Sequence, residues 1–594
     1  MKKILIAFVL LIVFGACTKN FEKLNTDPTQ FTKVSPEALM ETVIKRTGEM
    51  VGSNGLNDGI NVNMWQIANL VEPGARYAAN DQNIWRNSYV GILENLVQLN
   101  GLYGSDTAFA NRVQIAKIWQ AYIYSILVGY FGPIPVDQAN NPDYLNTIKF
   151  QDEDTVYTKI LTMLKTASDK IDVNKTKDKL TYDVLYGNGA NQLLNWKKFA
   201  NTLRLRIALR CRRNLTALAE THIREVMGNE SLLIANETET AKVVFENVNN
   251  NENPYYRVFT KNPYTLTFPK LPEMLFTYFR TYKDPRIDYY FDSVKTIANR
   301  YILTDTLTST GDDSLRIVTY PIPHYGLVKS STKLPGWTAI AGQTDPMAQN
   351  VNVFSNLASA IVTNPARPII VLSYAEAQFL KAEAAQLGLG GAQSPQTYYN
   401  MGIDANFAFW GISASVRDAY KNVDGVKWGT TPVNTFKNYI NICGTDLPAG
   451  DIYKIYFQSY LNCFPDQPFD AWCLQRQTRV LQLSPHTNPG FSGLIFQDVP
   501  DRGQYTPSIL AQNPGGYQSA LDLLGINNTN IETTNPYVKL KFEVPYTIPD
   551  WNARPAAYNY AYIQKWYGTT IQQLNAAAAA GGFTNLVKIT KTYK

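Results

Sequence analysis

Histidine is the scarcest residue of chemical consequence in this chain, with three copies among 594 residues. His222, His324 and His486 stand apart from one another and from any pair of cysteines. Zinc hydrolases need such ligands at short spacing, so the distribution argues against metal-dependent hydrolysis. The sequence also lacks a Gly-rich phosphate loop and a nucleophile elbow. We therefore expect no catalytic residues, no bound metal and no cofactor.

Cysteine is almost as rare, with five copies. A chain of this length can build a hydrophobic core without disulfides, so their absence would not prevent folding. Cys463 and Cys473 could form a disulfide in an exported protein, or they could be buried free thiols on helices. The sequence leaves both alternatives open.

Charge of either sign is sparse, at 18% of residues, and the formal net charge is only +6. Such a dilute charge predicts no nucleic-acid partner. Long apolar runs are also missing from the body of the chain. The most apolar stretch, 121–131, is interrupted by tyrosines, Ser125 and Gly129 and is followed by Pro133. We expect no membrane-spanning helix there.

The N-terminus carries the clearest motif: Met1-Lys2-Lys3, an unbroken apolar run over 4–14, and then Gly15-Ala16-Cys17. The run is too short to cross a bilayer of about 30 Å and is typical of a signal peptide. A cysteine directly after two small residues predicts a bacterial lipoprotein, cleaved after residue 16, acylated on Cys17 and tethered by residues 17–34. The alternative is an ordinary secreted protein with a chance cysteine at this position.

Tyrosine and tryptophan are abundant, with 37 and 10 copies. Aromatic faces and uncharged hydrogen-bonding groups suit sugars, although most rings in any protein belong to its core. We expect the tryptophans on helical stripes to be core residues: Trp85, Trp119, Trp196 and Trp410. Rings and polar groups in two loops rich in Gly and polar residues are the candidate ligand-binding residues: Trp65, Tyr77, Asn80, Asp81, Tyr325 and Trp337.

Apolar residues recur at helical spacing through most of the chain, which predicts a mainly α-helical fold. The stretch 230–368 lacks this periodicity and predicts loops with short strands. The helix over 195–213 places basic residues opposite an apolar stripe, so it could pack normally or lie on a lipid surface. One helix is expected to begin at Ser35-Pro36. The other expected helices cover residues 84–102, 110–131, 152–171, 195–213, 374–387, 396–409, 451–464, 470–483 and 556–566.

Several segments together resemble one known family. The block DVLYGNGANQLLNWKKFANTLRLRIALR (183–210) and the helix pair YAEAQFLKAEAAQLG (374–388) and YYNMGIDANFAFWG (398–411) are the main ones. YFGPIPV (130–136), KDPRIDYYF (283–291) and the pair over 454–479 follow in the same order as in the family. With these motifs the chain resembles the SusD/RagB family, the outer-membrane nutrient-binding lipoproteins of Bacteroidetes.

The resemblance implies tetratricopeptide-like helix pairs packed against an irregular, loop-rich ligand-binding half. It implies a single body over 35–594, with a helical scaffold over 35–229 and 370–485 and an irregular binding region over 230–369 and 486–594. It also implies a lipid-anchored protein at the outer membrane that faces the cell exterior. There it would capture an oligosaccharide or peptide for a SusC-like TonB-dependent β-barrel transporter, without being an enzyme.

Two other functions stay open at this level. A surface glycoside hydrolase would need two suitably placed carboxylates, whose separation a sequence does not give. The acidic cluster at 152–154 is explained by the start of a helix, where negative charge favours the dipole. A structural lipoprotein without a ligand is the third possibility.

The acyl chains, rather than the nearly neutral body, should hold the protein at the membrane. A Cys17→Ala variant should therefore move from the membrane fraction to the soluble fraction when cells are fractionated. Retention of the variant at the membrane in cells that lack the partner transporter would contradict the lipid anchor.

Overall fold

The computed structural model describes most of the chain between residues 34 and 544. The described residues are 34–57, 82–144, 148–261, 271, 275, 278–279, 282–293, 302–307, 313–318, 355–431, 450–481, 486–488, 495–497, 501–526 and 538–544. The signal, Cys17 and the helix expected over 556–566 lie outside them.

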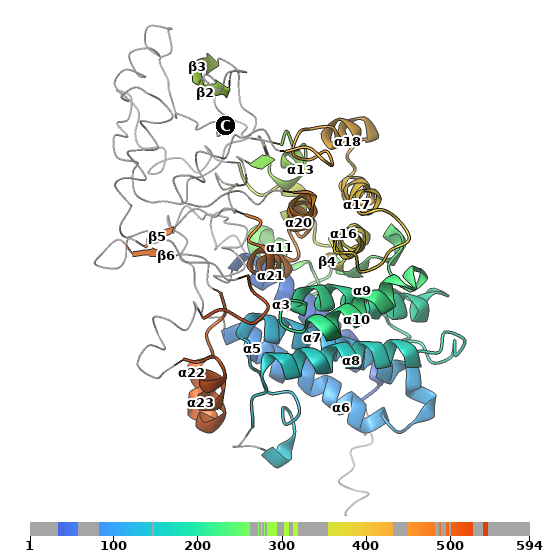
Figure 1. Cartoon of the computed structure of the whole chain (residues 1–594). Coiled ribbons are helices and arrows are strands. Elements are labelled where there is room, and N and C mark those ends of the chain that lie inside the picture. Colours follow the sequence, from blue (N-terminus) through green and yellow to red (C-terminus); the bar gives the residue numbers. More distant parts are fainter. Residues whose placement is uncertain are drawn as a thin grey trace, which may run out of the picture.

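The first part of the described chain is a stack of helices in which α7, α8, α9 and α10 each pack against the next (Figure 1). Helix α3 packs beside it against α6 and η1, a π-helix. The helices are α3 (Pro36–Asn57), α5 (Gln82–Arg86), η1 (Asn87–Leu93), α6 (Glu94–Tyr103), α7 (Ala110–Phe131), α8 (Glu153–Lys170), α9 (Gln192–Cys211) and α10 (Thr216–Met227), with short 3₁₀ turns η2 (Thr107–Phe109) and η3 (Pro142–Tyr144).

Local sequence signals set the ends of these helices. The Ser35 hydroxyl accepts a hydrogen bond from the Ala38 amide at 3.2 Å, and Asp152 accepts one from Thr155 at 3.1 Å. Such side-chain caps satisfy amides that the first turn leaves without a partner. Helix α7 ends at Phe131, where Gly132 takes φ +84° and Pro133 follows. The expected limits of these three helices are confirmed to within about one residue.

A second group of helices packs on the first through α16, which contacts α9, α17 and α20. Ser373 and Ser394 cap α16 and α17 by accepting amide hydrogen bonds at 3.0 and 3.1 Å. The helices expected over 374–387, 396–409 and 451–464 are confirmed to within about two residues, whereas the one expected over 470–483 runs over Pro468–Thr478, and α18 is additional. The group comprises α16 (Tyr374–Gln386), α17 (Pro395–Phe409), α18 (Ala414–Lys421), α20 (Asp451–Asn462) and α21 (Pro468–Thr478).

Short elements join the two groups, as the loss of periodicity predicts. Strand β1 pairs antiparallel with β4, and β2 with β3. The short elements that join the two groups include η4 (Glu230–Leu232), η5 (Glu237–Glu239), β1 (Ala241–Val243), α11 (Pro254–Tyr256), η6 (Arg257–Lys261), α13 (Ile287–Tyr290), β2 (Ile302–Leu307), β3 (Asp313–Val318), α15 (Ser359–Val362) and β4 (Ile369–Leu372).

The region after 485 differs in part from the irregular structure expected of it. Strands β5 (His486–Asn488) and β6 (Ile495–Gln497) pair antiparallel, and α22 (Pro507–Gln512) and α23 (Pro514–Leu523) then pack on each other. Proline at the first position of each helix presets the backbone angle, and Asn513 caps α23 through the Gly516 amide at 3.1 Å. The helices are too short to give a clear apolar period.

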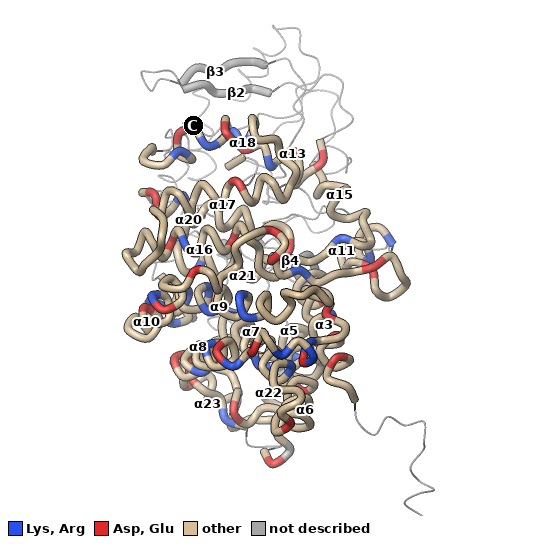
Figure 2. Tube along the Cα trace, turned by 90° about the vertical axis from the view of Figure 1, so that its right-hand side faces the viewer, with Lys and Arg blue, Asp and Glu red and all other residues tan. Residues whose placement is uncertain are grey.

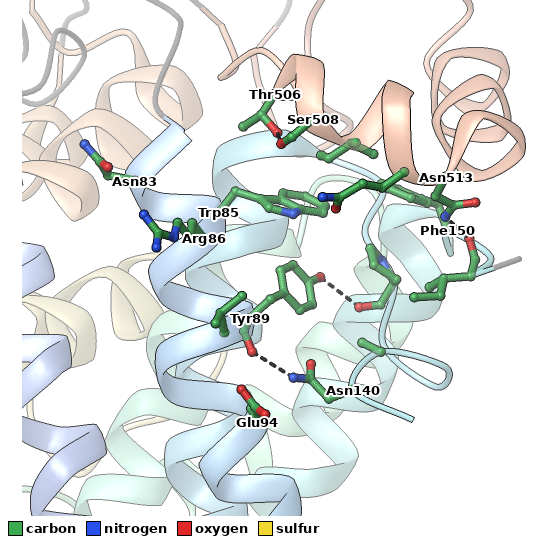
Figure 3. Close-up of a pocket in the computed structure, with 16 residues that line it drawn as sticks. Asn83, Trp85, Arg86, Tyr89, Glu94, Asn140, Phe150, Thr506, Ser508 and Asn513 are labelled. Atoms are coloured by element: carbon green, nitrogen blue, oxygen red, sulfur yellow. Dashed lines mark hydrogen bonds between the residues drawn. The ribbon is translucent and has the colours of Figure 1, made fainter. Parts of the chain in front are cut away.

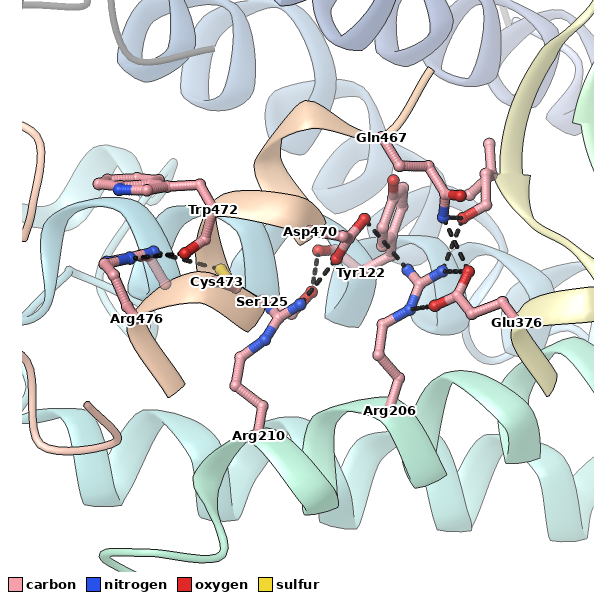
Figure 4. Close-up of polar contacts among 12 residues, drawn as sticks. Tyr122, Ser125, Arg206, Arg210, Glu376, Gln467, Asp470, Trp472, Cys473 and Arg476 are labelled. Carbon is pink, nitrogen blue, oxygen red and sulfur yellow. Dashed lines mark hydrogen bonds and ion pairs between the residues drawn. The ribbon is translucent and has the colours of Figure 1, made fainter. Parts of the chain in front are cut away.

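Of the two alternatives for α9, normal packing inside the protein is confirmed, although the exposure of its basic residues that an apolar stripe on one face implies is wrong. Arg204, Arg206 and Arg210 are all buried. Glu376 of α16 and Asp470 of α21 neutralise Arg206 and Arg210, as Figure 4 shows. Because these charges are paired inside the protein, the alternative that α9 lies on a lipid surface is also wrong.

The structure tests two predictions about the core: the burial of four tryptophans and whether the cysteines form a disulfide. Trp119 and Trp196 are fully buried as expected, whereas Trp85 and Trp410 are only half-buried. Cys211, Cys463 and Cys473 are buried free thiols, so Cys463 and Cys473 do not form a disulfide.

The buried Glu383 side chain on α16 makes the stability of the protein depend on pH. Loss of solvation raises the pKa of Glu383 to about 7, against the opposing effects of Arg212 and a Tyr456 hydrogen bond. Because this pKa lies above the ordinary value of 4.5, the contribution of the Glu383 carboxyl group to folding stability is fully present below pH 4.5 and is lost as the pH rises through 7. The loss at pH 8 is on the order of 3 kcal/mol.

Glu383→Gln should therefore be more stable than the wild type at pH 8 and about equally stable at pH 5, by urea denaturation. Exposed Glu41→Gln on α3 is the matched control and should follow the wild-type profile. A Glu383→Gln profile parallel to the wild type would contradict the assignment.

Candidate functional site

A cavity of about 620 Å³ opens between α5 and η1 on one side and α22 on the other. The connection between α7 and α8 closes a third side, through Pro135, Asn140 and Phe150. Figure 3 shows these walls and the side chains that project from them. Segments far apart in the sequence thus build one pocket, which we call the aromatic pocket.

Trp85 is the central ring of the aromatic pocket. Its indole stacks on Phe150, with ring centroids 5.8 Å apart and planes 13° from parallel. Phe131 and Tyr505 meet the indole edge-on at 5.2 and 6.0 Å. This packing holds the half-buried indole in place at the pocket. A fixed aromatic face is the element that stacks on the apolar face of a sugar ring.

Tyr89 and Asn140 form the next part of the wall. The Tyr89 hydroxyl donates to the Pro135 carbonyl at 2.8 Å, and Asn140 Nδ2 donates to the Tyr89 carbonyl at 2.8 Å. Burial raises the pKa of Tyr89 well above its usual value, so the phenol stays protonated and remains a donor. Asn140 has φ +59°, a left-handed conformation that asparagine tolerates better than most residues.

The rim of the aromatic pocket is polar and carries little net charge. Exposed amide and hydroxyl groups come from Asn83, Ser508 and Gln512. Arg86 and Glu94 contribute one positive and one negative charge. Among the described residues that line the pocket, Glu94 is the single carboxylate. A glycosidase needs two carboxylates across the scissile bond, so this lining suits binding rather than hydrolysis.

The wall that bears Tyr89 is a π-helix, η1. A π-helix is rare, and π-helical turns inside α-helices are frequently found at functional sites. Here the Gly91 carbonyl accepts hydrogen bonds from Asn95 Nδ2 at 3.0 Å and from Arg46 Nη1 at 3.1 Å. The local geometry therefore marks this segment independently of the cavity beside it.

The ligand-binding residues expected from sequence lie outside the described residues, so their role stays a prediction. The loop chosen for three of them ends next to α5, and the pocket lining begins at Asn83. Trp85 was expected in the core and instead lines the pocket. The polar residues around 80–83 are the feature of the sequence from which Asn83 could have been predicted as a pocket residue. These untested residues are Trp65, Tyr77, Asn80, Asp81, Tyr325 and Trp337.

The described residues give no sign of a metal centre or a membrane span. No group of three or more His, Cys, Asp or Glu side chains in this part of the chain is placed to hold a metal ion. Within the same residues, no helix has the length and apolar character needed to cross a bilayer. Positive and negative side chains are interspersed along the described helices (Figure 2).

The helical scaffold and its aromatic, weakly charged pocket define a binding protein of mainly α-helical class. The sequence profile of a SusD-like family, described as "Starch-binding associating with outer membrane", matches residues 28–505. The chain belongs to this SusD/RagB family, a family of binding proteins and not of enzymes. No curated protein matches it in sequence.

Solved structures share the fold. A SusD-like protein described as Bacteroidetes AC2a is 20% identical, with a TM-score of 0.65, over 86% of this chain and 100% of its own. A chitin-binding SusD homologue from Flavobacterium johnsoniae is 21% identical, with a TM-score of 0.62, over 86% and 98%. A SusD homologue from Bacteroides uniformis is 18% identical, with a TM-score of 0.62, over 86% and 100%. The mainly α-helical prediction is confirmed.

The left-handed backbone at Asn140 can be tested with a pair of substitutions. Asn140→Gly removes the hydrogen bond to Tyr89 but keeps a residue that accepts φ +59°, whereas Asn140→Ala adds backbone strain. In urea denaturation, the alanine variant should be less stable than the glycine variant by about 1 kcal/mol. Equal stability of the two variants would show that this conformation is unimportant.

Proposed function

We propose that this protein is a cell-surface lipoprotein that binds an oligosaccharide and passes it to a SusC-like TonB-dependent transporter. The observation that carries the proposal is the Trp85 indole, held by Phe150 and surrounded by amide and hydroxyl groups at the mouth of the aromatic pocket. Sugars present apolar faces and hydroxyls together, and this lining offers a partner for each.

The family and its structural relatives support a carbohydrate ligand. The family description names starch, and the relative from Flavobacterium johnsoniae is described as chitin-binding. Both polymers are built of pyranose rings with stackable faces. A pocket of about 620 Å³ accommodates a short stretch of such a chain.

The N-terminal motif and the family support the proposed arrangement at the membrane. A lipid on Cys17 and the tether over 17–34 would keep the body at the outer membrane, facing the exterior, and let it move relative to the transporter. Co-purification of a large outer-membrane β-barrel with the lipidated protein tests this partnership, and its absence under all mild extraction conditions would count against it.

Replacing Trp85 by leucine should weaken oligosaccharide binding about tenfold, since a sugar–ring stack is worth on the order of 1 kcal/mol. Isothermal titration calorimetry with starch and chitin oligosaccharides measures the change, and circular dichroism confirms that the variant is folded. Tyr182→Ala removes another exposed ring, 68% exposed and outside the pocket, and should bind as the wild type does.

Two results would contradict the proposal. One is an unchanged affinity of Trp85→Leu for a ligand that the wild type binds. The other is the release of reducing ends from these oligosaccharides by the wild type, which would make the protein a hydrolase.

A further inference from the structure

A second cavity, of about 450 Å³, lies against the same π-helix as the aromatic pocket. Its lining comes from α3, from the junction of α5 with η1 and from Arg257 at the start of η6. Arg86 and Val90 line both cavities. Val90 is 60% exposed, so the two cavities meet at an open rim. A single extended ligand can therefore reach both.

The charge of this second cavity differs from that of the aromatic pocket. Arg46, Arg86 and Arg257 line it together with one carboxylate, Glu49, which leaves an excess of positive charge. Arg257 Nη2 donates to Glu49 Oε1 at 2.8 Å, so these two side chains offset each other. The excess thus lies on Arg46 and Arg86. We call this the basic cavity.

Arg46 is held in place by the shape of η1. Its Nη1 donates to the Gly91 carbonyl at 3.1 Å, and a Cβ at Gly91 would come within 3.0 Å of the same nitrogen. A side chain at position 91 would require the guanidinium to shift by a few tenths of an ångström. A guanidinium carries five donor hydrogens, and among the described residues the Gly91 carbonyl is the acceptor that Arg46 contacts.

The chemistry of this lining selects an anion. A planar guanidinium matches the two oxygens of a carboxylate or a sulfate, and such charge-assisted hydrogen bonds are about twice as strong as neutral ones. A neutral sugar hydroxyl would not offset the charge on Arg46 and Arg86. The aromatic pocket, with Arg86 and Glu94, has no comparable excess.

We propose that the basic cavity binds an anionic substituent, a carboxylate or a sulfate ester, on the same oligosaccharide whose ring stacks on Trp85. This inference rests on the proposed function and specifies its ligand class. The ligand is then an acidic glycan segment that lies across Val90, with one sugar in the aromatic pocket and its charged neighbour beside Arg46.

The test compares oligosaccharides that differ only in charge. One pair is an oligogalacturonate and its methyl ester, and the other is a sulfated galactan oligosaccharide and its desulfated form. Calorimetry on the full chain should show at least about tenfold tighter binding of the charged member of one pair or both. The pair that shows the preference identifies the group as carboxylate or sulfate. Higher salt should reduce the preference.

Arg46→Gln should reduce the preference for the charged member, because only Arg86 of the two excess charges remains. It should not change the affinity for the neutral member, because Arg46 does not line the aromatic pocket. Arg213→Gln removes an exposed arginine at the end of α9 and should keep the wild-type preference. Equal wild-type affinity for charged and neutral members, or a preference that Arg46→Gln leaves undiminished, overturns the inference and leaves the proposed function intact.

Binding of free glucuronate tests the anion site in the basic cavity separately from the proposed capture of oligosaccharides. If it raises the melting temperature of the wild type but not of Arg46→Gln while no oligosaccharide binds, the anion site stands and the proposed capture of oligosaccharides fails. If glucuronate has no effect and both pairs bind without a charge preference, the anion site is overturned.

Discussion

Two arginines one turn apart on α9 hold the helical body together. Arg206 makes a bidentate pair with Glu376 of α16, at 2.5 and 2.6 Å, and Arg210 pairs with Asp470 of α21 at 2.7 Å. Asp470 also lies 3.5 Å from Arg206, and Gln467 donates to Glu376 at 2.8 Å. Removing one partner from a buried pair of this kind costs about 3 to 5 kcal/mol, because the remaining charge is left without compensation. The network therefore fixes how the second group of helices sits on the first.

The pocket inherits its shape from that arrangement. Arg476 extends from α21 to the Gly129 carbonyl of α7 and to the Asp501 carbonyl, each at 2.6 Å. The Gly503 amide then donates to the Tyr130 carbonyl at 2.7 Å, which ties the segment before α22 to the end of α7. Because α22 follows directly, its place over the aromatic pocket depends on these contacts. The shape of the aromatic pocket thus depends on buried hydrogen bonds between segments hundreds of residues apart.

The sequence predicted the parts of this structure that depend on local signals. Helix α7 ends where Gly132 and Pro133 require it to end, and Ser35 caps α3 where expected. Periodicity shows which residues share a face, but it does not show whether a neighbour covers that face. For this reason Trp85 was expected in the core and the α9 arginines at the surface. Their true environments depend on partners such as Glu376, 170 residues away from Arg206 in sequence. The family motifs identified the fold and the kind of protein, whereas the pocket required coordinates.

The central claim is that a sugar ring occupies the aromatic pocket between α5, η1 and α22. Weak net charge, a fixed indole and a rim of amides and hydroxyls all favour such a ligand over a metal or a nucleic acid. The most direct measurement is a crystal structure of the full mature chain with a bound oligosaccharide. The account predicts a pyranose ring stacked on Trp85, with its chain running across Val90. An oligosaccharide bound elsewhere, with the indole of Trp85 uncovered, would contradict it.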